Sequence, residues 1–149
     1  MVHFGVTRHP TDAWIAQQLR EGTPYALVPR FLIRDNDRKF GEQSASVAKT
    51  SGIEVLRIPY RAPRANAVCE RFLGSVRREC LDHFFILNEG QLYRVLKEYV
   101  TFFNARRPHQ GIDQQIPEQL GSSRESPREG KIVSFPVLNG LHHDYRRVA

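Results

Sequence analysis

The stretch RFLIRDNDRKFGEQSASVAKTSGIEVLRIPY, residues 30–60, decides the fold class. Its first part is a short apolar run followed by DND, a pattern typical of a buried strand whose C-terminal end opens onto a site. A helix is predicted over the segment that ends at Gly52, and IEVLRIPY is predicted as a second strand that Pro59 stops. Strands that alternate with a helix indicate an α/β fold with parallel pairing.

The residues before this stretch add one strand and one helix to the prediction. MVHFGVT alternates apolar and polar residues, so a strand is expected from the first residue. In HPTDAWIAQQLREG, Thr11 is placed to cap a helix and Gly22 is placed to end it.

Two long helices are predicted after residue 60. The first runs from Ala65 to about Phe84, and residues at helical spacing give it an apolar core face: Cys69, Phe72, Leu73, Val76 and Cys80. The second follows Asn88, which is placed as its N-cap with Gln91 at the capping-box position. Residues 121–149 are interpreted as a Pro/Gly/Ser-rich linker and a basic tail with one strand.

The composition favours an intracellular protein with an acidic partner. The 149 residues suffice for one domain, and the formal charge of +6 with a pI near 9.7 favours nucleic acid. No apolar run approaches a membrane span or a signal peptide, so a cytoplasmic location is expected. Cys69 and Cys80 lie about 16 Å apart along the predicted helix, too far for a disulfide, and are expected to be free, buried thiols.

Glu70 stands out within the basic stretch RANAVCERFLGSVRREC, residues 64–80. On a helical wheel it shares one stripe with Asn66, Gly74 and Arg77, away from the apolar face. Arginines at positions 71 and 78 flank the stripe. A carboxylate there would repel DNA unless it held a divalent cation, and Mg²⁺ prefers one or two carboxylates together with phosphate oxygens. Asp35, at the end of the first strand in the opening stretch, is the expected partner carboxylate.

Three segments carry a resemblance to a known family: FLIRDNDRKFG, GIEVLRIPYRAPRANAVCERFLGSVRRECLDH and YVTFFNARRPHQGIDQQIPEQ. They resemble the integrase catalytic core of insertion-sequence transposases and retroviral-type integrases, most specifically over residues 31–117. The resemblance implies an RNase H-like α/β fold, with a partial core at 1–120. It also implies DNA integration by an Asp, Asp, Glu triad that binds two Mg²⁺ or Mn²⁺ ions.

The resemblance assigns individual residues. Asp35 corresponds to the second aspartate, with Asp37 as the alternative ligand, and Glu70 corresponds to the catalytic glutamate. The polar and basic residues around Glu70 would contact DNA: Asn66, Arg71, Arg77 and Arg78. NARRPH, residues 104–109, matches a signature after the helix to which no chemical role is assigned. His109 is expected to be a helix cap or loop contact, and the histidine pair in LHHDYRR is interpreted as surface residues rather than a metal site.

The departure from the family pattern concerns the first aspartate. By this alignment MVHFGVT is the third strand, so the first two strands and the first aspartate are absent. Asp12 is not expected to replace it, because it falls in the first turn of a helix. We therefore expect a truncated core that binds DNA weakly and cleaves nothing. Its expected partners are DNA and either a second copy of the chain or a full-length transposase. Two alternatives stay open, a non-catalytic basic DNA-binding or transposase-assembly fragment and an unproductive gene remnant.

Overall fold

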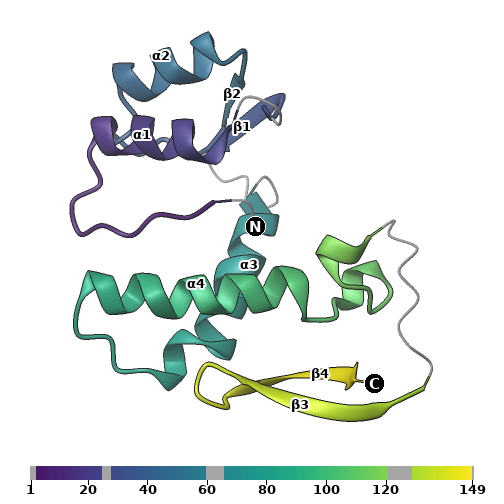
Figure 1. The fold of residues 1–149 in the computed structure, drawn as a ribbon. Helices are drawn as coiled ribbons and strands as arrows, with labels where there is room; N and C mark the ends of the chain where they lie inside the picture. Colours follow the sequence, from purple (N-terminus) through teal and green to yellow (C-terminus); the bar gives the residue numbers. More distant parts are fainter. Residues whose placement is uncertain (1–2, 25–27, 60–65, 121–128, 149) are drawn as a thin grey trace. The chain divides into compact units, whose positions relative to one another are not determined.

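A computed structural model describes residues 3–24, 28–59, 66–120 and 129–148. The chain divides into two compact units, Met1–Ser75 and Val76–Ala149 (Figure 1). The predicted α/β class is confirmed, because helices and strands alternate in the first unit. No helix in the described part of the chain is long and apolar enough to cross a membrane.

The first unit contains the predicted strand–helix–strand segment. Strands β1 (Phe31–Arg34) and β2 (Glu54–Arg57) pair in parallel, with Phe31 opposite Glu54 and Arg34 opposite Arg57. Helix α2 (Glu42–Thr50) connects them and is followed by Gly52, whose φ of +71° lies in the left-handed region that glycine tolerates.

The expectation that the first strand is buried is wrong. Phe31, Ile33 and Leu56 point to one face of the sheet and remain 41%, 53% and 39% exposed. The reason is that α1 and α2 cover only the opposite face, where Leu32 and Val55 lie. A two-stranded sheet with one covered face cannot bury both sides of a strand.

Helix α1 (Asp12–Gly22) begins where the sequence predicts. The Thr11 hydroxyl accepts a hydrogen bond from the backbone N–H of Trp14 at 3.2 Å, so Thr11 is the N-cap. Gly22 is the last residue of the helix.

Residues 3–7 form no strand, contrary to prediction. They lie against α1 instead: His3 Nε2 is 2.9 Å from Gln18 Oε1. A Cβ on Gly5 would lie 2.7 Å from Trp14 Cζ2, which shows how closely the backbone approaches the helix. Extended residues become a strand only by pairing, and among the described residues β1 pairs with β2 alone.

The Asp12 carboxylate caps the neighbouring helix α2. It accepts backbone N–H groups from Gly41 at 2.9 Å, Gln43 at 2.8 Å and Ser44 at 3.0 Å, which are orphan donors at the start of α2. Hydrogen bonding by the Ser44 side chain, with contributions from the three N–H groups, lowers the pKa of Asp12 to about 2. A Cβ at Gly41 would lie 2.6 Å from Asp12 Oδ2, so glycine permits this approach.

Helix α3 (Ala67–Glu79) ends earlier than predicted and is followed by the single turn η2 (Leu81–His83). Val76 and Cys80 are buried as predicted, and burial raises the pKa of the Cys80 thiol to about 11. Cys69 and Leu73, by contrast, are exposed, so the predicted core face holds only near the end of the helix. Both cysteines are free.

Helix α4 (Glu89–Ala105) begins as predicted. Asn88 Oδ1 accepts the N–H of Gln91 at 2.8 Å. The Gln91 side chain reaches back to accept the N–H of Leu87, also at 2.8 Å. Tyr99 and Phe102 are the buried residues of the helix.

The Glu79 carboxylate joins α3, α4 and the segment after α4. Arg107 donates to both of its oxygens, from Nε at 2.8 Å and Nη2 at 2.7 Å, and the Tyr99 hydroxyl donates at 2.9 Å. Burial and this bond to Glu79 raise the pKa of Tyr99. This bidentate contact gives the NARRPH segment a structural role.

His109 is a loop contact, as expected. Its Nε2 lies 2.8 Å from the Phe103 carbonyl oxygen. Its ring packs edge-on against the Phe103 ring, with the ring centroids 4.4 Å apart. The turns η3 (Gln110–Ile112) and η4 (Pro117–Gln119) follow.

The last residues form a hairpin rather than one strand. Strands β3 (Lys131–Val137) and β4 (His142–Val148) pair antiparallel, and Leu138, Asn139 and Gly140 turn the chain with positive φ values. Figure 1 shows the hairpin beside α4, and the N–H of Leu138 donates to Glu98 Oε1 at 2.6 Å.

His142 anchors this hairpin, which corrects the interpretation of both histidines as surface residues. Its ring stacks on Phe102 with centroids 5.0 Å apart, and its Nε2 lies 2.6 Å from the Glu79 carbonyl oxygen. His143 is exposed, as predicted.

Asp12→Asn tests the cap on α2. Asparagine loses the charge and one acceptor oxygen, so we expect the Tm at neutral pH to fall by on the order of 5 °C. The pKa of Asp12 is about 2 in the fold and 3.8 ordinarily, so its charged form stabilises the fold above pH 3.8. That stabilisation disappears as the pH falls towards 2, and the variant should therefore lose less stability over this range. Fluorescence of the single tryptophan, Trp14, reports the transition.

Asp113→Asn is the matched control for this experiment, because Asp113 is exposed and its φ of +54° suits asparagine. Identical pH profiles for the two variants would contradict the cap.

Arg107→Met tests the Glu79 contact. It leaves a carboxylate that is only 25% exposed without its charge partner, so we expect the free energy of unfolding to fall by about 2–4 kcal/mol. Arg107→Lys keeps the charge but loses the parallel hydrogen bonds, so its free energy of unfolding should lie between those of the unaltered chain and Arg107→Met. Urea unfolding followed by circular dichroism measures both, with exposed Arg94→Met as control. Equal stability of Arg107→Met and Arg94→Met would rule the contact out as a major stabiliser.

Candidate catalytic site

Asp35 lies directly after β1, at the C-terminal end of the strand, and is exposed. One of its oxygens, Oδ1, accepts the N–H of Asp37 at 3.2 Å, which bends the chain away from the strand. Its side chain makes no other hydrogen bond or ion pair with the described residues, although its charge helps to raise the pKa of Lys39. Asp35 therefore keeps acceptor capacity that a cation could use.

The alternative ligand Asp37 is occupied. Its Oδ1 accepts the N–H of Lys39 at 3.0 Å, and its Oδ2 pairs with Lys39 Nζ at 2.9 Å. Hydrogen bonding from the Lys39 backbone, then from its ammonium group, lowers the pKa of Asp37. Because a cation at Asp37 would have to displace Lys39, the local contacts favour Asp35 over Asp37.

Glu70 lies in the first turn of α3, which begins at Ala67 rather than at the predicted Ala65. Negative charge is favoured at this end of a helix by the peptide dipoles. The side chain is exposed and makes no hydrogen bond or ion pair within the part of the chain that the structure describes. Like Asp35, it is an exposed carboxylate, which suits the oxygen preference of Mg²⁺ or Mn²⁺.

The predicted DNA contacts follow α3 and the residue before it. Asn66 precedes the helix and is half-buried, while Arg71, Arg77 and Arg78 are exposed. Arg77 lies 3.4 Å from Asp82, but both side chains are mostly exposed, so this pair is weak. The three guanidinium groups are thus available to an anionic partner.

The structure does not test whether Asp35 and Glu70 meet. The connection between them passes through residues 60–65, outside the described residues. Among those that are described, no three His, Cys, Asp or Glu side chains gather as a metal centre. Asp12, the other acid weighed from the sequence, lies in the first turn of α1 as expected and serves as the cap on α2. The pair of Asp35 and Glu70 stays a prediction.

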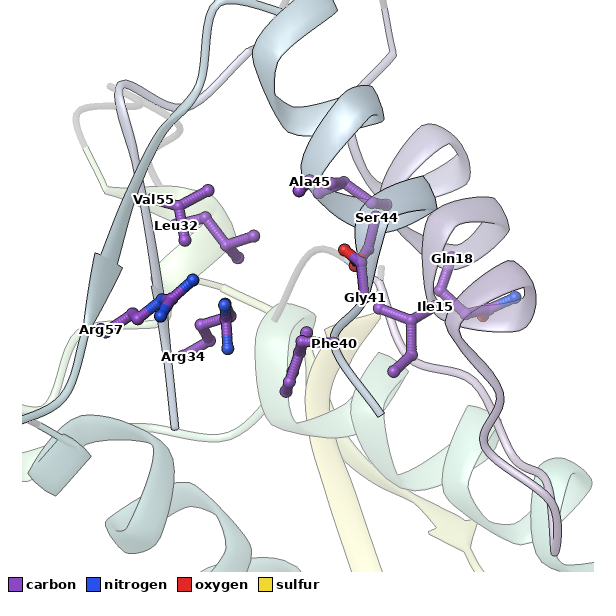
Figure 2. Close-up of a pocket in the computed structure, with 11 residues that line it drawn as sticks. Ile15, Gln18, Leu32, Arg34, Phe40, Gly41, Ser44, Ala45, Val55 and Arg57 are labelled. Carbon is purple, nitrogen blue, oxygen red and sulfur yellow. Dashed lines mark hydrogen bonds between the residues drawn. The ribbon is translucent and has the colours of Figure 1, made fainter. Parts of the chain in front are cut away.

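A cavity of about 360 Å³ lies in the first unit between the sheet and helices α1 and α2. Figure 2 shows Leu32 and Val55 on one side, with the guanidinium groups of Arg34 and Arg57 next to each other below them. The Arg34 guanidinium lies 4.9 Å from the centre of the Phe40 ring. Neither candidate acid lines the cavity, so it is not the predicted metal site.

Residues 51–117 match the integrase core domain family. We refer to residues 51–117 as the integrase core segment, after the family that they match. It contains β2, α3 with Glu70, α4 and the Glu79–Arg107 contact, whereas Asp35 lies before it.

Proteins of bacterial insertion elements are related to the chain. It is 27% identical over 136 residues to the uncharacterized 39.2 kDa protein of insertion element IS476 from Xanthomonas euvesicatoria, covering 90% of this chain and 39% of that protein. It is 21% identical over 114 residues to the uncharacterized 31.7 kDa protein of insertion element IS407 from Burkholderia multivorans, covering 76% of this chain and 41% of that protein. The predicted resemblance to insertion-sequence integrase cores is confirmed, and the chain spans about two fifths of the length of these relatives.

Asp35→Asn and Asp37→Asn form a matched pair that identifies the metal ligand beside the integrase core segment. We expect Asp35→Asn to weaken Mn²⁺ binding by about tenfold or more, and Asp37→Asn to leave it nearly unchanged because Lys39 already occupies that carboxylate. Electron paramagnetic resonance of free Mn²⁺ during a titration measures both affinities. The reverse order would make Asp37 the ligand.

Proposed function

We propose that the chain supplies part of an RNase H-like catalytic core that cuts and joins DNA by metal-dependent phosphoryl transfer, as in transposition. The observation that carries the proposal is Glu70, an exposed carboxylate at the start of α3 within the integrase core segment that makes no ion pair with any residue the structure describes. The relation to insertion-element proteins supports DNA as the substrate.

Asp35 and Glu70 would act as metal ligands rather than as general acids. Two bound Mg²⁺ or Mn²⁺ ions would provide the Lewis acidity that activates an attacking oxygen and stabilises the leaving 3′-oxygen. Both side chains are exposed, so they can approach a phosphate bound at the surface. Without a cation the same carboxylates would repel that phosphate.

Asn66, Arg71, Arg77 and Arg78 would hold the DNA backbone beside Glu70. They accompany Glu70 on one short helical segment. Guanidinium and amide groups donate hydrogen bonds to phosphate oxygens, and such contacts position DNA without reading its sequence.

The third carboxylate of the site would come from outside these 149 residues, together with strands that extend the sheet. In support, β1 pairs with β2 on one side, and no described strand pairs with its other edge. A free edge presents unpaired N–H and C=O groups that another strand can use. With two of three acids, the chain by itself would bind DNA without cutting it.

A second candidate function is non-catalytic DNA binding or assembly with a complete transposase. It is favoured by the basic charge of the chain. Both candidates share DNA binding and differ in cleavage.

Supplying the missing acid distinguishes the two. The chain would be compared with a version that carries, ahead of residue 1, a strand hairpin bearing an aspartate. We expect Mn²⁺-dependent nicking of DNA only in the extended version, with a loss of at least about a hundredfold in Glu70→Gln, because charge stabilisation by a ligated cation supplies several kcal/mol. Gel assays of supercoiled plasmid measure nicking, and Glu42→Gln, at an exposed residue of α2, is the matched control.

The outcomes separate cleanly. Robust nicking by the unextended chain would overturn the role of an outside acid. No nicking by a folded extended version would favour the non-catalytic function.

A further inference from the structure

A groove of about 480 Å³ lies in the second unit, between α4 and the β3–β4 hairpin. One wall is the exposed side of α4, with Arg94, Lys97 and Thr101, and the other is the strand pair around Phe135 and Arg146. None of the residues assigned to the metal site or to the DNA contacts beside it lines the groove.

Positive charge dominates this groove. Four lining side chains are cationic, Arg94, Lys97, Arg106 and Arg146, against the two acids Glu98 and Asp144, which leaves +2. A surface with this excess attracts phosphate at a distance of a Debye length, about 8 Å at physiological salt.

The two acids are already engaged by the protein. Asp144 is 7% exposed, with Arg106 Nε at 3.3 Å and Arg146 Nε as a second partner. Glu98 accepts the backbone N–H of Leu138 at 2.6 Å. The contacts of both acids fix the walls of the groove, and the charge of Asp144 is balanced by its two arginines, while the charge of Glu98 is already counted in the balance of +2.

Arg94 and Lys97, in contrast, are exposed and make no ion pair within the part of the chain that the structure describes. They lie three residues apart on α4, so they are neighbours on one helix face. Two cations that line a groove from neighbouring positions on one helix suit successive phosphates of a strand better than a single small anion.

Phe135 adds an apolar surface to the same groove. Its ring is 38% exposed, and the Arg146 guanidinium lies 4.9 Å from its centre. Aromatic rings between cations are found in proteins that bind nucleic-acid strands, where bases contact the ring and phosphates contact the charges.

We propose that the groove between α4 and the β3–β4 hairpin binds the phosphodiester backbone of DNA, with Arg94 and Lys97 as its principal contacts. The site needs no metal ion and shares no residue with the candidate catalytic site. The proposal depends on the proposed function in one respect, the choice of DNA as the nucleic acid that binds.

Neutralising the two cations tests the proposal. Arg94→Gln with Lys97→Gln removes two charges and keeps most of each side-chain stem. The control, Arg20→Gln with Lys49→Gln, removes the same charge from exposed residues of α1 and α2. Binding of a fluorescein-labelled DNA of 20 nucleotides, as single strand and as duplex, is measured by anisotropy in EDTA over a series of salt concentrations.

We expect the groove variant to bind at least about tenfold more weakly at low salt, and the slope of log affinity against log salt to fall by about 2, one for each phosphate contact. The control should change both quantities much less. A loss confined to the single strand or to the duplex identifies which form the groove holds, and either supports the site. Equal losses in groove and control variants, or no binding by the unaltered chain, would overturn it.

Lysine acetylation of the unaltered chain gives a second measurement that involves no variant. DNA should slow acetylation of Lys97 at least about threefold and leave Lys49 unaffected, as read by mass spectrometry, because a bound phosphate covers the amine. Equal rates at Lys97 with and without DNA would contradict the site. Because anisotropy in EDTA measures DNA binding without metal, whereas plasmid nicking requires metal, failure of the groove and failure of the proposed catalysis are distinguishable.

Discussion

The architecture of the second unit depends on one residue at the end of α3. The Glu79 carboxylate accepts hydrogen bonds from Arg107 and from the Tyr99 hydroxyl. The Glu79 carbonyl oxygen lies within hydrogen-bond distance of His142 Nε2. One residue thereby ties together α3, α4, the segment after α4 and the hairpin, which are far apart in the sequence. A bidentate contact in a site with limited exposure fixes orientation as well as distance, so the position of each segment follows from it.

The groove is a consequence of this anchoring. His142 holds one strand of the hairpin against Phe102, and Glu98 holds its turn at Leu138. The strand register then places Phe135 opposite Asp144 on the side that lines the groove. Exposed cations on a mobile tail would each lose conformational freedom on binding a phosphate, whereas here the backbone that carries them is already ordered.

Local patterns predicted the elements that depend on neighbouring residues. The strand–helix–strand segment from Phe31 to Arg57, the Thr11 cap and the Asn88 cap with Gln91 are all read within a few residues of sequence. The hairpin was missed although Asn139 and Gly140 between β-forming residues are a known turn signal. The family assignment of Glu70 also came from a local motif. The helix that carries Glu70 begins at Ala67, whereas the sequence predicted a start at Ala65.

Contacts across long separations had no such signal. Asp12 caps a helix whose first donors lie 29–32 residues later, and Arg107 meets Glu79 across 28 residues. Nothing in the composition of either segment distinguishes these carboxylates from ordinary surface acids. The expected strand at residues 3–7 failed for the related reason that alternation shows what a strand could bury but not whether a partner strand exists.

The charged residues of the groove and the candidate metal ligands differ in their surroundings, and this difference separates DNA binding from DNA cleavage. In the groove, Asp144 is paired with Arg106 and Arg146, so Arg94 and Lys97 are the cations that can meet phosphate directly. The candidate acids Asp35 and Glu70 are exposed, and they repel phosphate until a cation neutralises them. A DNA strand could therefore be held through the groove without metal, while reaction at Glu70 would wait for metal. In a core of this kind DNA affinity and catalytic competence would be set by different residues, and loss of one carboxylate would abolish cleavage without releasing the DNA.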